Sequence, residues 1–587
     1  MALRDVLLSI AQTPHRLRRR ALVTWTPAQE LNEVRDRSGP RMKRRLEWYD
    51  LVGLGVGGML GAGVFVTTGR VARDTAGPAV FASYVIAGVS ALLSSFCYAE
   101  FSVRVPVAGG AFSYLRVTFG EFVGFFGGAN ILMEYVLSNA AVARSFTDYL
   151  ASTFGVTEHN AWRIIVDGIA DGYNALDVPA VALILLITVC LCYSTKESSM
   201  LNMVLTVFHL LFFAFIIAAG LWNGSARNLV RPHGLAPYGV RGVLDGAAIV
   251  YFSYIGYDSA CTMAEEIRDP SRALPVGIAG SVLVVSALYC LMSVALCVML
   301  PYTEAPLPAV QSLIRCLMFF SAHRTCLALL QISEAAPFSS AFREKAGWRW
   351  ASSVVGAGAS IGIVASLLVA MLGQARYLCV IARARLVPLW FAKVHPSTGT
   401  PMNATIFLGF CTASLALFTE LQIVFEMISI GTLLVFYLVA NALIYHRYVK
   451  IGTNRPLHVL LFLLLLTLSS LGFSLSRKID GWYRWGMTLF GAISIAITTI
   501  FHCTARQDIT GPPLEWSVPL MPWPAAASVF LNVFLITTLK VRSFQRFGIW
   551  SLVIIVFYVC YGVHSTYSAE ENEIVNAMIH HANLDIS

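Results

Sequence analysis

The residues best placed to do chemistry lie where two hydrophobic segments are interrupted at their centres. The first interruption contains Gly61, Ala62 and Gly63, and the second covers residues 252–258. A membrane helix keeps its backbone hydrogen-bonded internally, because lipid offers no other partner. Backbone N–H and carbonyl groups are therefore exposed at membrane depth only where they line a cavity. Two interrupted helices predict a divided binding site of the kind found in transporters.

The two interruptions could together bind the constant part of an α-amino acid. The N–H groups of the first interruption would lie at the start of a half-helix, where a carboxylate is stabilised. Freed carbonyls of Phe252, Ser253 and Ile255 could accept hydrogen bonds from an ammonium group. The glycines resemble a dinucleotide-binding fingerprint only loosely, and no soluble βαβ unit surrounds them. We therefore expect an amino acid site rather than a nucleotide site.

Two acidic residues could bind a cationic side chain. Glu134 lies about halfway along the third hydrophobic segment, where a carboxylate would attract a cation or carry a proton. Pairing with Arg144 in the same segment is the alternative. Asp258 follows the second interruption and could cap the second half-helix as well as contact a substrate. We include both acids among the expected substrate-binding residues.

Three further ionisable residues are expected in the membrane or at its edge. Glu100 ends the second segment, where it could form a gate or a salt bridge to a loop arginine. His209 on the fifth segment could couple proton movement to transport, or could be an ordinary core histidine. Glu426 begins the tenth segment, where it could face the outer interface, so we leave it out of the site.

The composition predicts an all-α polytopic membrane protein. Of 587 residues, 57% are hydrophobic and 13% are charged, whereas a soluble domain has about 25% charged residues. The net charge of +9 does not indicate a nucleic-acid partner, because the basic residues gather between hydrophobic segments as the positive-inside rule describes. The twelve cysteines form no CxxC pair. We expect no metal and no cofactor.

Fourteen segments are long and apolar enough to span a bilayer, which takes about 20 residues. They lie near residues 49–70, 79–104, 120–150, 177–195, 200–222, 242–264, 276–300, 351–378, 403–419, 422–446, 456–475, 484–503, 519–539 and 547–566. Basic loops place both termini in the cytosol, although the loop before the last segment breaks the rule. We expect a basic cytosolic tail (1–48), a ten-helix core (49–450) and four additional helices with a C-terminal tail (451–587).

Short motifs in a fixed order carry a family resemblance over residues 45–450. They are GAGVF (61–65), YAEF (98–101), PVAGGAFSY (106–114), KES (196–198), YFSYIGYD (251–258), AEEIRDP (264–270), QARY (374–377), IAR (381–383) and SIGTL (429–433). With them the chain resembles the cationic amino acid transporters of the amino acid–polyamine–organocation superfamily, and most closely the plant members.

The resemblance implies a LeuT-type fold, in which spans 1–5 and 6–10 are inverted repeats and spans 1 and 6 are broken. It implies uptake of cationic amino acids, either as a proton-coupled symporter or driven by the membrane potential. We add large neutral amino acids as further candidate substrates. In proton-coupled relatives a lysine on the fifth span replaces a sodium ion, and His209 falls at that position. The plasma membrane is favoured over the vacuolar membrane.

Besides His209, the chain departs from the family pattern at two places. Ala384 and Arg385 stand where the family usually has Asp-Gly, and the family lacks residues 305–331. The second departure predicts an anomalous insertion in an outside loop, such as an unspliced intron. A membrane amino acid sensor without net transport remains an alternative function. An enzyme is not expected, because we find neither a nucleophile–base pair nor an HExxH motif.

Overall fold

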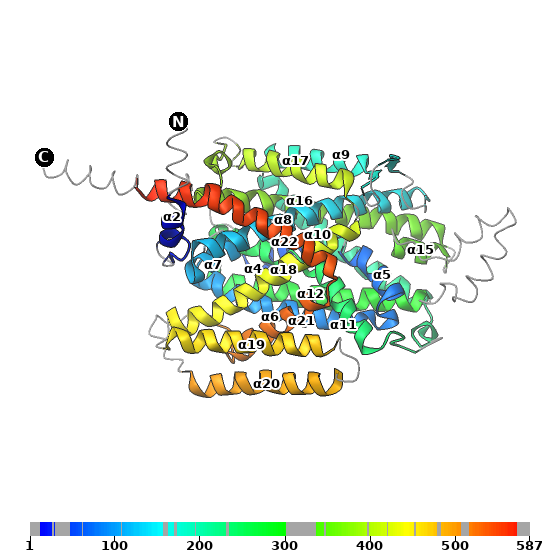
Figure 1. Ribbon diagram of the computed structural model, residues 1–587. Helices are drawn as coiled ribbons and strands as arrows, with labels where there is room; N and C mark the ends of the chain where they lie inside the picture. The colour runs from blue at the N-terminus through cyan, green and yellow to red at the C-terminus, as the bar shows by residue number, and fades with distance from the viewer. Residues whose placement is uncertain are drawn as a thin grey trace, which may run out of the picture.

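The computed structural model is almost entirely helical, and its long helices form one bundle (Figure 1). The structure describes residues 12–25, 29, 47–61, 63–106, 109–156, 162–168, 173–193, 195–230, 234–300, 336–344, 348–395, 398, 400–419, 421–450, 454–477, 483–505 and 516–571. The expected insertion (305–331) and the expected site residue Ala62 lie outside these described residues.

Helices fall on all fourteen segments that the hydropathy predicted. In the first half of the chain they are α4 (Trp48–Met59), η1 (Gly63–Thr67), α5 (Thr68–Asp74), α6 (Val80–Arg104), α8 (Glu121–Thr153), α9 (Val178–Tyr193), α10 (Thr195–Asn223), α11 (Gly239–Val250), η4 (Tyr251–Tyr254), η5 (Tyr257–Glu266) and α12 (Pro270–Met299). In the second half they are α16 (Arg349–Arg383), α17 (Met402–Phe418), α18 (Leu421–Tyr445), η8 (His446–Lys450), α19 (Pro456–Ser476), α20 (Tyr483–Thr504), α21 (Trp523–Thr538), α22 (Val541–Phe557) and η9 (Tyr558–Gly562).

Shorter elements that the sequence did not predict connect these helices. They are α2 (Thr13–Arg20), η2 (Gly77–Ala79), α7 (Ala111–Phe119), β1 (Ile164–Ile165), β2 (Ala175–Leu176), η3 (Ala226–Leu229), α15 (Pro337–Glu344) and η7 (Leu389–Ala392). β1 and β2 pair antiparallel and form the only sheet in the described residues.

The helices have the lengths and the apolar composition of a polytopic membrane protein. Within the described part, nine helical segments are long and apolar enough to cross a membrane. Three further apolar helices, α9, α17 and α21, are shorter. In Figure 1, α20 lies at one edge of the bundle beside α19, and α9 lies beside α17 at the opposite edge.

Both expected interruptions lie in the middle of the bundle. α4 ends at Met59, and the chain resumes at Gly63 as the π-helical turn η1. α11 ends at Val250 and continues as the short 3-10 helices η4 and η5, which are separated at Gly256. Long helices pack around these two segments: α12 contacts α4 and α6, and α16 contacts α4 and α8.

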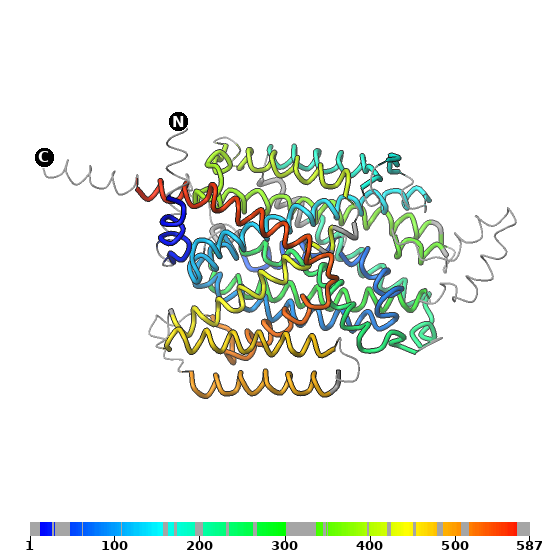
Figure 2. The backbone as a smooth tube through the Cα atoms, in the orientation of Figure 1, coloured from blue at the N-terminus to red at the C-terminus, as the bar shows by residue number. Residues whose placement is uncertain are grey.

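Part of the expected N-terminal tail packs against the bundle. α2 lies beside the C-terminal end of the last long helix (Figure 2). The Arg20 guanidinium pairs with Glu121 at 2.6 Å and with Glu570 at 2.9 Å. The backbone carbonyl of Ala21 also accepts a hydrogen bond from the Phe122 N–H at 3.1 Å. Both ends of the described chain therefore lie on the same side of the bundle.

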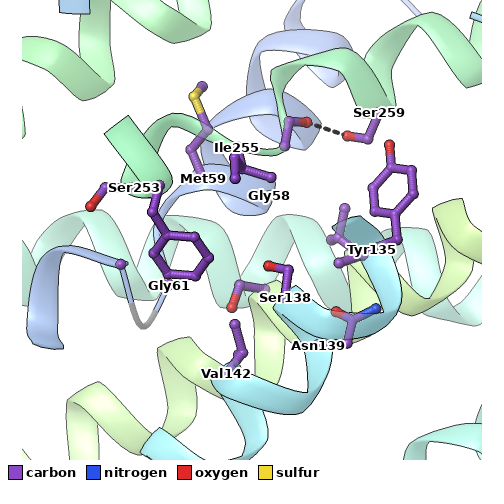
Figure 3. A pocket seen from close by; sticks show the side chains of 16 residues that line it. Gly58, Met59, Gly61, Tyr135, Ser138, Asn139, Val142, Ser253, Ile255 and Ser259 are labelled. Atoms are coloured by element: carbon purple, nitrogen blue, oxygen red, sulfur yellow. Dashed lines mark hydrogen bonds between the residues drawn. The ribbon is translucent and has the colours of Figure 1, made fainter. Parts of the chain in front are cut away.

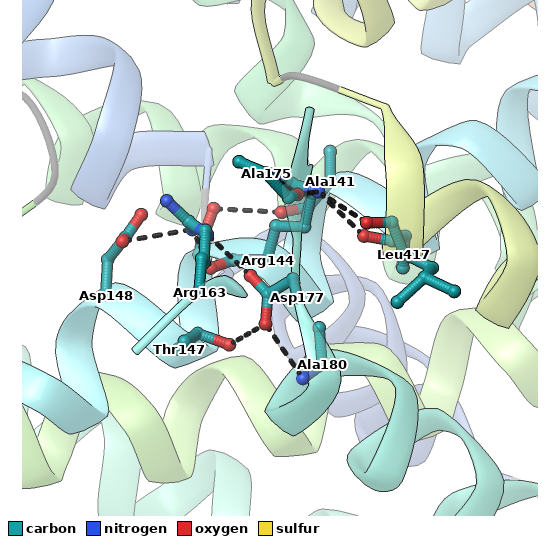
Figure 4. A network of polar contacts seen from close by, with 11 residues as sticks. Ala141, Arg144, Thr147, Asp148, Arg163, Ala175, Asp177, Ala180 and Leu417 are labelled. Carbon is teal, nitrogen blue, oxygen red and sulfur yellow. Dashed lines mark hydrogen bonds and ion pairs between the residues drawn. The ribbon is translucent and has the colours of Figure 1, made fainter. Parts of the chain in front are cut away.

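Arg144 belongs to a polar network near the C-terminal end of α8 (Figure 4). Its guanidinium donates to the carbonyls of Ala416 at 2.9 Å and of Ala175 at 3.2 Å. The expected alternative, a pair between Arg144 and Glu134, is not formed. Ten residues separate the two in α8, which is about 15 Å along a helix.

The same network buries a second arginine between two acids. Arg163 contacts Asp148 at 3.0 Å and Asp177 at 2.8 Å, and all three side chains are at most 6% exposed. Burial alone would lower the pKa of Arg163, but the two carboxylates outweigh it and raise that pKa above its usual value. Asp177 also accepts hydrogen bonds from Thr147 and from the Ala180 N–H, which ties α8 to the start of α9.

Substituting Arg163→Gln should strongly destabilise the protein. It would leave two buried carboxylates without a cation, which costs about 3–5 kcal/mol of the free energy of unfolding. Thermal unfolding of the purified protein in detergent measures this. The control is Arg268→Gln, which breaks an exposed pair with Glu47 and should cost at most about 1 kcal/mol. Equal losses in the two variants would contradict the assignment.

Candidate functional site

The two interrupted segments approach each other backbone to backbone, and glycines make this possible. A Cβ atom built on Gly63 would lie 2.6 Å from the Cα of Ser253. A Cβ atom built on Gly256 would lie 2.9 Å from the carbonyl of Gly58, and Gly256 also has a φ of +123°. Real Cβ atoms essentially never come closer than 3.0 Å to such atoms. The glycines that interrupt the helices therefore also let the two segments touch.

Side-chain hydroxyls satisfy part of the freed backbone. The Tyr289 hydroxyl lies 2.5 Å from the carbonyl oxygen of Met59 and 2.9 Å from that of Ser253, so it bridges the two interruptions. Thr67 donates to the Gly63 carbonyl at 2.6 Å, and its oxygen lies 3.2 Å from Ser253 Oγ. A buried polar group without a partner is costly. These contacts keep the break stable without helical hydrogen bonds.

A small cavity lies between the two interruptions and the helices α8 and α16. Its volume is about 30 Å³, which is room for about two water molecules. Figure 3 shows Tyr135, Ser138, Asn139 and Val142 of α8 lining one side of it. The other lining residues are Gly58, Met59, Gly61, Gly63, Phe252, Ser253, Ile255, Gly256, Ser259, Ser366, Val369 and Ala370. An amino acid would fit only if these walls moved apart.

The structure brings together five of the eight expected substrate-binding residues. Gly61, Gly63, Phe252, Ser253 and Ile255 all line the cavity. Two of the three carbonyls that we expected to be free already accept hydrogen bonds: that of Ser253 from the Tyr289 hydroxyl at 2.9 Å, and that of Phe252 from the Ile255 N–H at 3.2 Å. The two expected acidic residues do not line the cavity.

These two acids, Glu134 and Asp258, lie behind one wall of the cavity. Both are buried, and they are close enough to interact electrostatically. Tyr135 connects them to the cavity, because its ring lines the wall and its hydroxyl donates to Asp258 at 3.1 Å. Within the described residues, no cation pairs with either acid, and the hydroxyl of Thr432 is the polar side-chain group beside the Glu134 carboxylate. A buried pair of carboxylates in this state favours a cation or protons.

His209 lies in an aromatic pocket. Its ring is 2% exposed, stacks on Phe65 at a centroid distance of 5.9 Å, and lies 4.8 Å from the Phe213 ring. It also packs so closely on Gly362 of α16 that a Cβ atom there would overlap the imidazole. The buried Nε2 atom has no hydrogen-bond partner among the described residues. His209 thus joins α10 to the first interrupted segment and to α16.

Glu100 is the centre of a buried ionic cluster. Its carboxylate accepts from Arg104 at 2.7 Å, from Arg447 at 3.2 Å and from the Val518 N–H at 2.8 Å. The salt bridge to a nearby arginine that we considered as an alternative is therefore present. The cluster joins α6, η8 and the segment before α21.

We did not predict from the sequence that α8 and α16 line the cavity, although the spacing of their residues carries a signal. Residues 135, 138, 139 and 142 are spaced as one face of a helix, and so are residues 366, 369 and 370. The polar members of that face include Asn139, whose amide donates to Gln374 of α16 at 2.9 Å. Polar residues repeating at helical spacing in an apolar segment mark a face that is not turned to lipid. No cluster that could hold a metal occurs among the described residues.

Substituting Gly63→Ala should prevent the two interrupted segments from packing. The added methyl group would collide with the Cα atom of Ser253 as well as with its side chain, so a side-chain rotation alone could not relieve the contact. We expect little monodisperse protein in size-exclusion chromatography after solubilisation, and a lower unfolding temperature for what remains. Gly548→Ala in α22 is the matched control, because a Cβ atom there meets nothing within 4 Å. A Gly63→Ala protein as stable as this control would contradict the packing argument.

Known proteins resemble this chain over nearly its whole length. Residues 46–523 match the amino acid permease family, and residues 516–566 match the C-terminal part of that family. The chain is 50% identical to cationic amino acid transporter 6, chloroplastic, of Arabidopsis thaliana, over 97% of this chain and 94% of the relative. Cationic amino acid transporter 7, chloroplastic, from the same plant is also 50% identical with the same coverage.

A further relative is cationic amino acid transporter 1 of Arabidopsis thaliana, which is 40% identical over 96% of this chain and 90% of its own length. The matched family and relatives are permeases and transporters over nearly the full length of the chain, which indicates a transporter and not an enzyme. The chain belongs to the amino acid permease family and, within the amino acid–polyamine–organocation superfamily, to the plant cationic amino acid transporters.

Proposed function

We propose that the protein is a secondary active transporter of cationic L-amino acids, with large neutral ones as weaker substrates. The observation that carries the proposal is the buried pair Glu134 and Asp258, which lacks a described cation and adjoins the divided cavity. A cationic side chain would supply the missing charge. The names of the relatives, cationic amino acid transporters, support the same substrate class.

In the proposed binding mode, each part of the substrate meets a different wall. The α-carboxylate binds at the start of η1, near the Gly63 N–H. The Gly61 N–H donates to the Met59 carbonyl at 2.8 Å and would join only after that hydrogen bond opens. The ammonium group binds the Ile255 carbonyl and the second lone pair of the Phe252 carbonyl, which already accepts from the Ile255 N–H at 3.2 Å. The Ser253 carbonyl already contacts Tyr289. The cationic side chain extends past Tyr135 toward the acid pair.

We further propose the LeuT-type arrangement with 5+5 inverted repeats and fourteen membrane-crossing segments. The position of the breaks supports it, because α4–η1 belongs to the first hydrophobic segment and α11–η4–η5 to the sixth. The narrow cavity fits alternating access, in which the walls part toward one side of the membrane at a time. The Glu100 cluster is a candidate gate, because opening the bundle where α6 meets η8 would separate Glu100 from Arg447.

The membrane potential and protons are the proposed driving forces. An inside-negative potential favours cation entry by about 2.3 kcal/mol per charge per 100 mV. His209 is the proposed coupling group, because it contacts both the first interrupted segment and α16. Its protonation would therefore bias how these segments pack.

The membrane in which the protein works is also a proposal. The sequence favoured the plasma membrane, whereas two relatives at 50% identity are named chloroplastic and a third, at 39% identity, is named vacuolar. We propose an organelle membrane on the strength of these names. Co-localisation of a fluorescent fusion with envelope, vacuolar and plasma membrane markers tests this.

Replacing Glu134→Gln should selectively weaken transport of cations. Because one of two buried negative charges is removed, we expect uptake of labelled arginine at low concentration to fall at least about tenfold. Uptake of labelled leucine should fall much less. Glu571→Gln, at the exposed end of the last helix, should leave both unchanged. Equal losses for arginine and leucine in Glu134→Gln would remove this residue from the cation site.

Purified protein in liposomes should accumulate labelled arginine in response to an inside-negative potassium diffusion potential. At 100 mV the limit for one charge is about fiftyfold accumulation. An inward proton gradient at zero potential should also drive uptake in the wild type, and His209→Gln should lose that part while keeping the response to potential. A proton-driven component that survives in His209→Gln would assign coupling elsewhere. Binding of arginine without uptake would favour a sensor.

A further inference from the structure

A second cavity, larger than the first, lies where the N-terminal segment packs on the bundle. Its volume is about 210 Å³, many times the 10–15 Å³ or so that one water needs. Its lining combines Arg20 and Trp25 of the N-terminal segment, Arg116 of α7, Arg385 after α16, and Glu570 near the C-terminal end of the described chain. Neither the amino acid site nor the proposed gate uses these residues.

Cationic side chains outnumber acidic ones in the described lining of this cavity, where three residues are arginines. Glu570 is the one acidic side chain in its described lining, and its carboxylate is held by Arg20 at 2.9 Å. The Arg116 guanidinium lies 4.2 Å above the Trp25 ring. The buried Nε atoms of Arg20 and Arg385 and the indole N–H of Trp25 have no acceptor among the described residues. Such a set of donors calls for an anion.

Arg385 is held in an unusual conformation at this place. Its φ is +61°, in the left-handed region that disfavours any side chain with a Cβ atom. The related family usually has glycine at this position, which would adopt the same backbone freely. A strained residue that also places a buried Nε–H without an acceptor beside a cavity indicates a binding role rather than a packing role.

We propose that this cavity binds a phosphate group through Arg385, Arg116 and the Trp25 indole. Guanidinium groups bind phosphate oxygens through paired, charge-assisted hydrogen bonds, and the indole N–H adds a further donor. The group can belong to a free phosphate or to the headgroup of an anionic lipid at the edge of the membrane. Binding ties the N-terminal segment to the ends of α7, α16 and the last helix.

The test uses purified full-length protein in detergent and the unfolding temperature as the readout. Inorganic phosphate is titrated at constant ionic strength, with chloride as the reference anion. The informative variants are Arg385→Asn and Arg385→Gly, since both residues tolerate the left-handed backbone. The matched control is Arg272→Asn, which removes an exposed arginine at the start of α12. We expect phosphate to stabilise the wild type and the control, and the two Arg385 variants to need at least about tenfold more phosphate.

A second arm distinguishes the source of the phosphate. The same proteins are measured in nanodiscs of phosphatidylcholine alone and with added phosphatidic acid. Stabilisation by phosphatidic acid but not by free phosphate, lost in both Arg385 variants, assigns the site to a lipid headgroup. The proposal is overturned if neither probe stabilises the wild type, or if the Arg385 variants respond as the wild type does.

Discussion

The close contact between the two interrupted helices is the constraint on which the rest of the site depends. Gly58 meets Gly256, and Gly63 meets Ser253, at distances that leave no room for a Cβ atom. This contact places residues of both segments around one cavity. Tyr289 reinforces it by touching a carbonyl on each segment. The proposed binding groups belong to two separate segments. Any motion that parts these segments would therefore disrupt the proposed site and couple substrate binding to conformational change.

The arrangement of charges separates the parts that hold the protein together from the part proposed to bind substrate. Glu100 and Glu121 are fully buried and each contacts an arginine, and Arg163 is buried between two acids. Only the pair formed by Glu134 and Asp258 is buried beside a cavity without a cation from the described chain. Leaving this pair uncompensated costs stability. In a transporter for cations such a pair would favour substrate binding, because the positive charge of the substrate would offset the repulsion between the two carboxylates.

Much of the architecture could be predicted because it depends on local sequence. The length of each apolar segment identified the helices, and glycines such as Gly61 and Gly63 identified the breaks. The hydrogen-bond partners of Arg144 could not be predicted from local sequence, because Ala175 and Ala416 lie far from it along the chain. The docking of α2 likewise rests on the contact between Arg20 and Glu121, which are 101 positions apart. Long-range contacts of this kind leave no periodic signal.

The central claim is that an amino acid binds between the two interrupted segments with its charged side chain directed at the acid pair. A cryo-electron microscopy map of the purified protein with bound L-arginine tests this most directly. The account predicts density for the α-carboxylate at Gly61 and Gly63, with the guanidinium group toward Asp258 and Glu134. Density in the reverse orientation, or arginine bound at another cavity while this one stays closed, would contradict it.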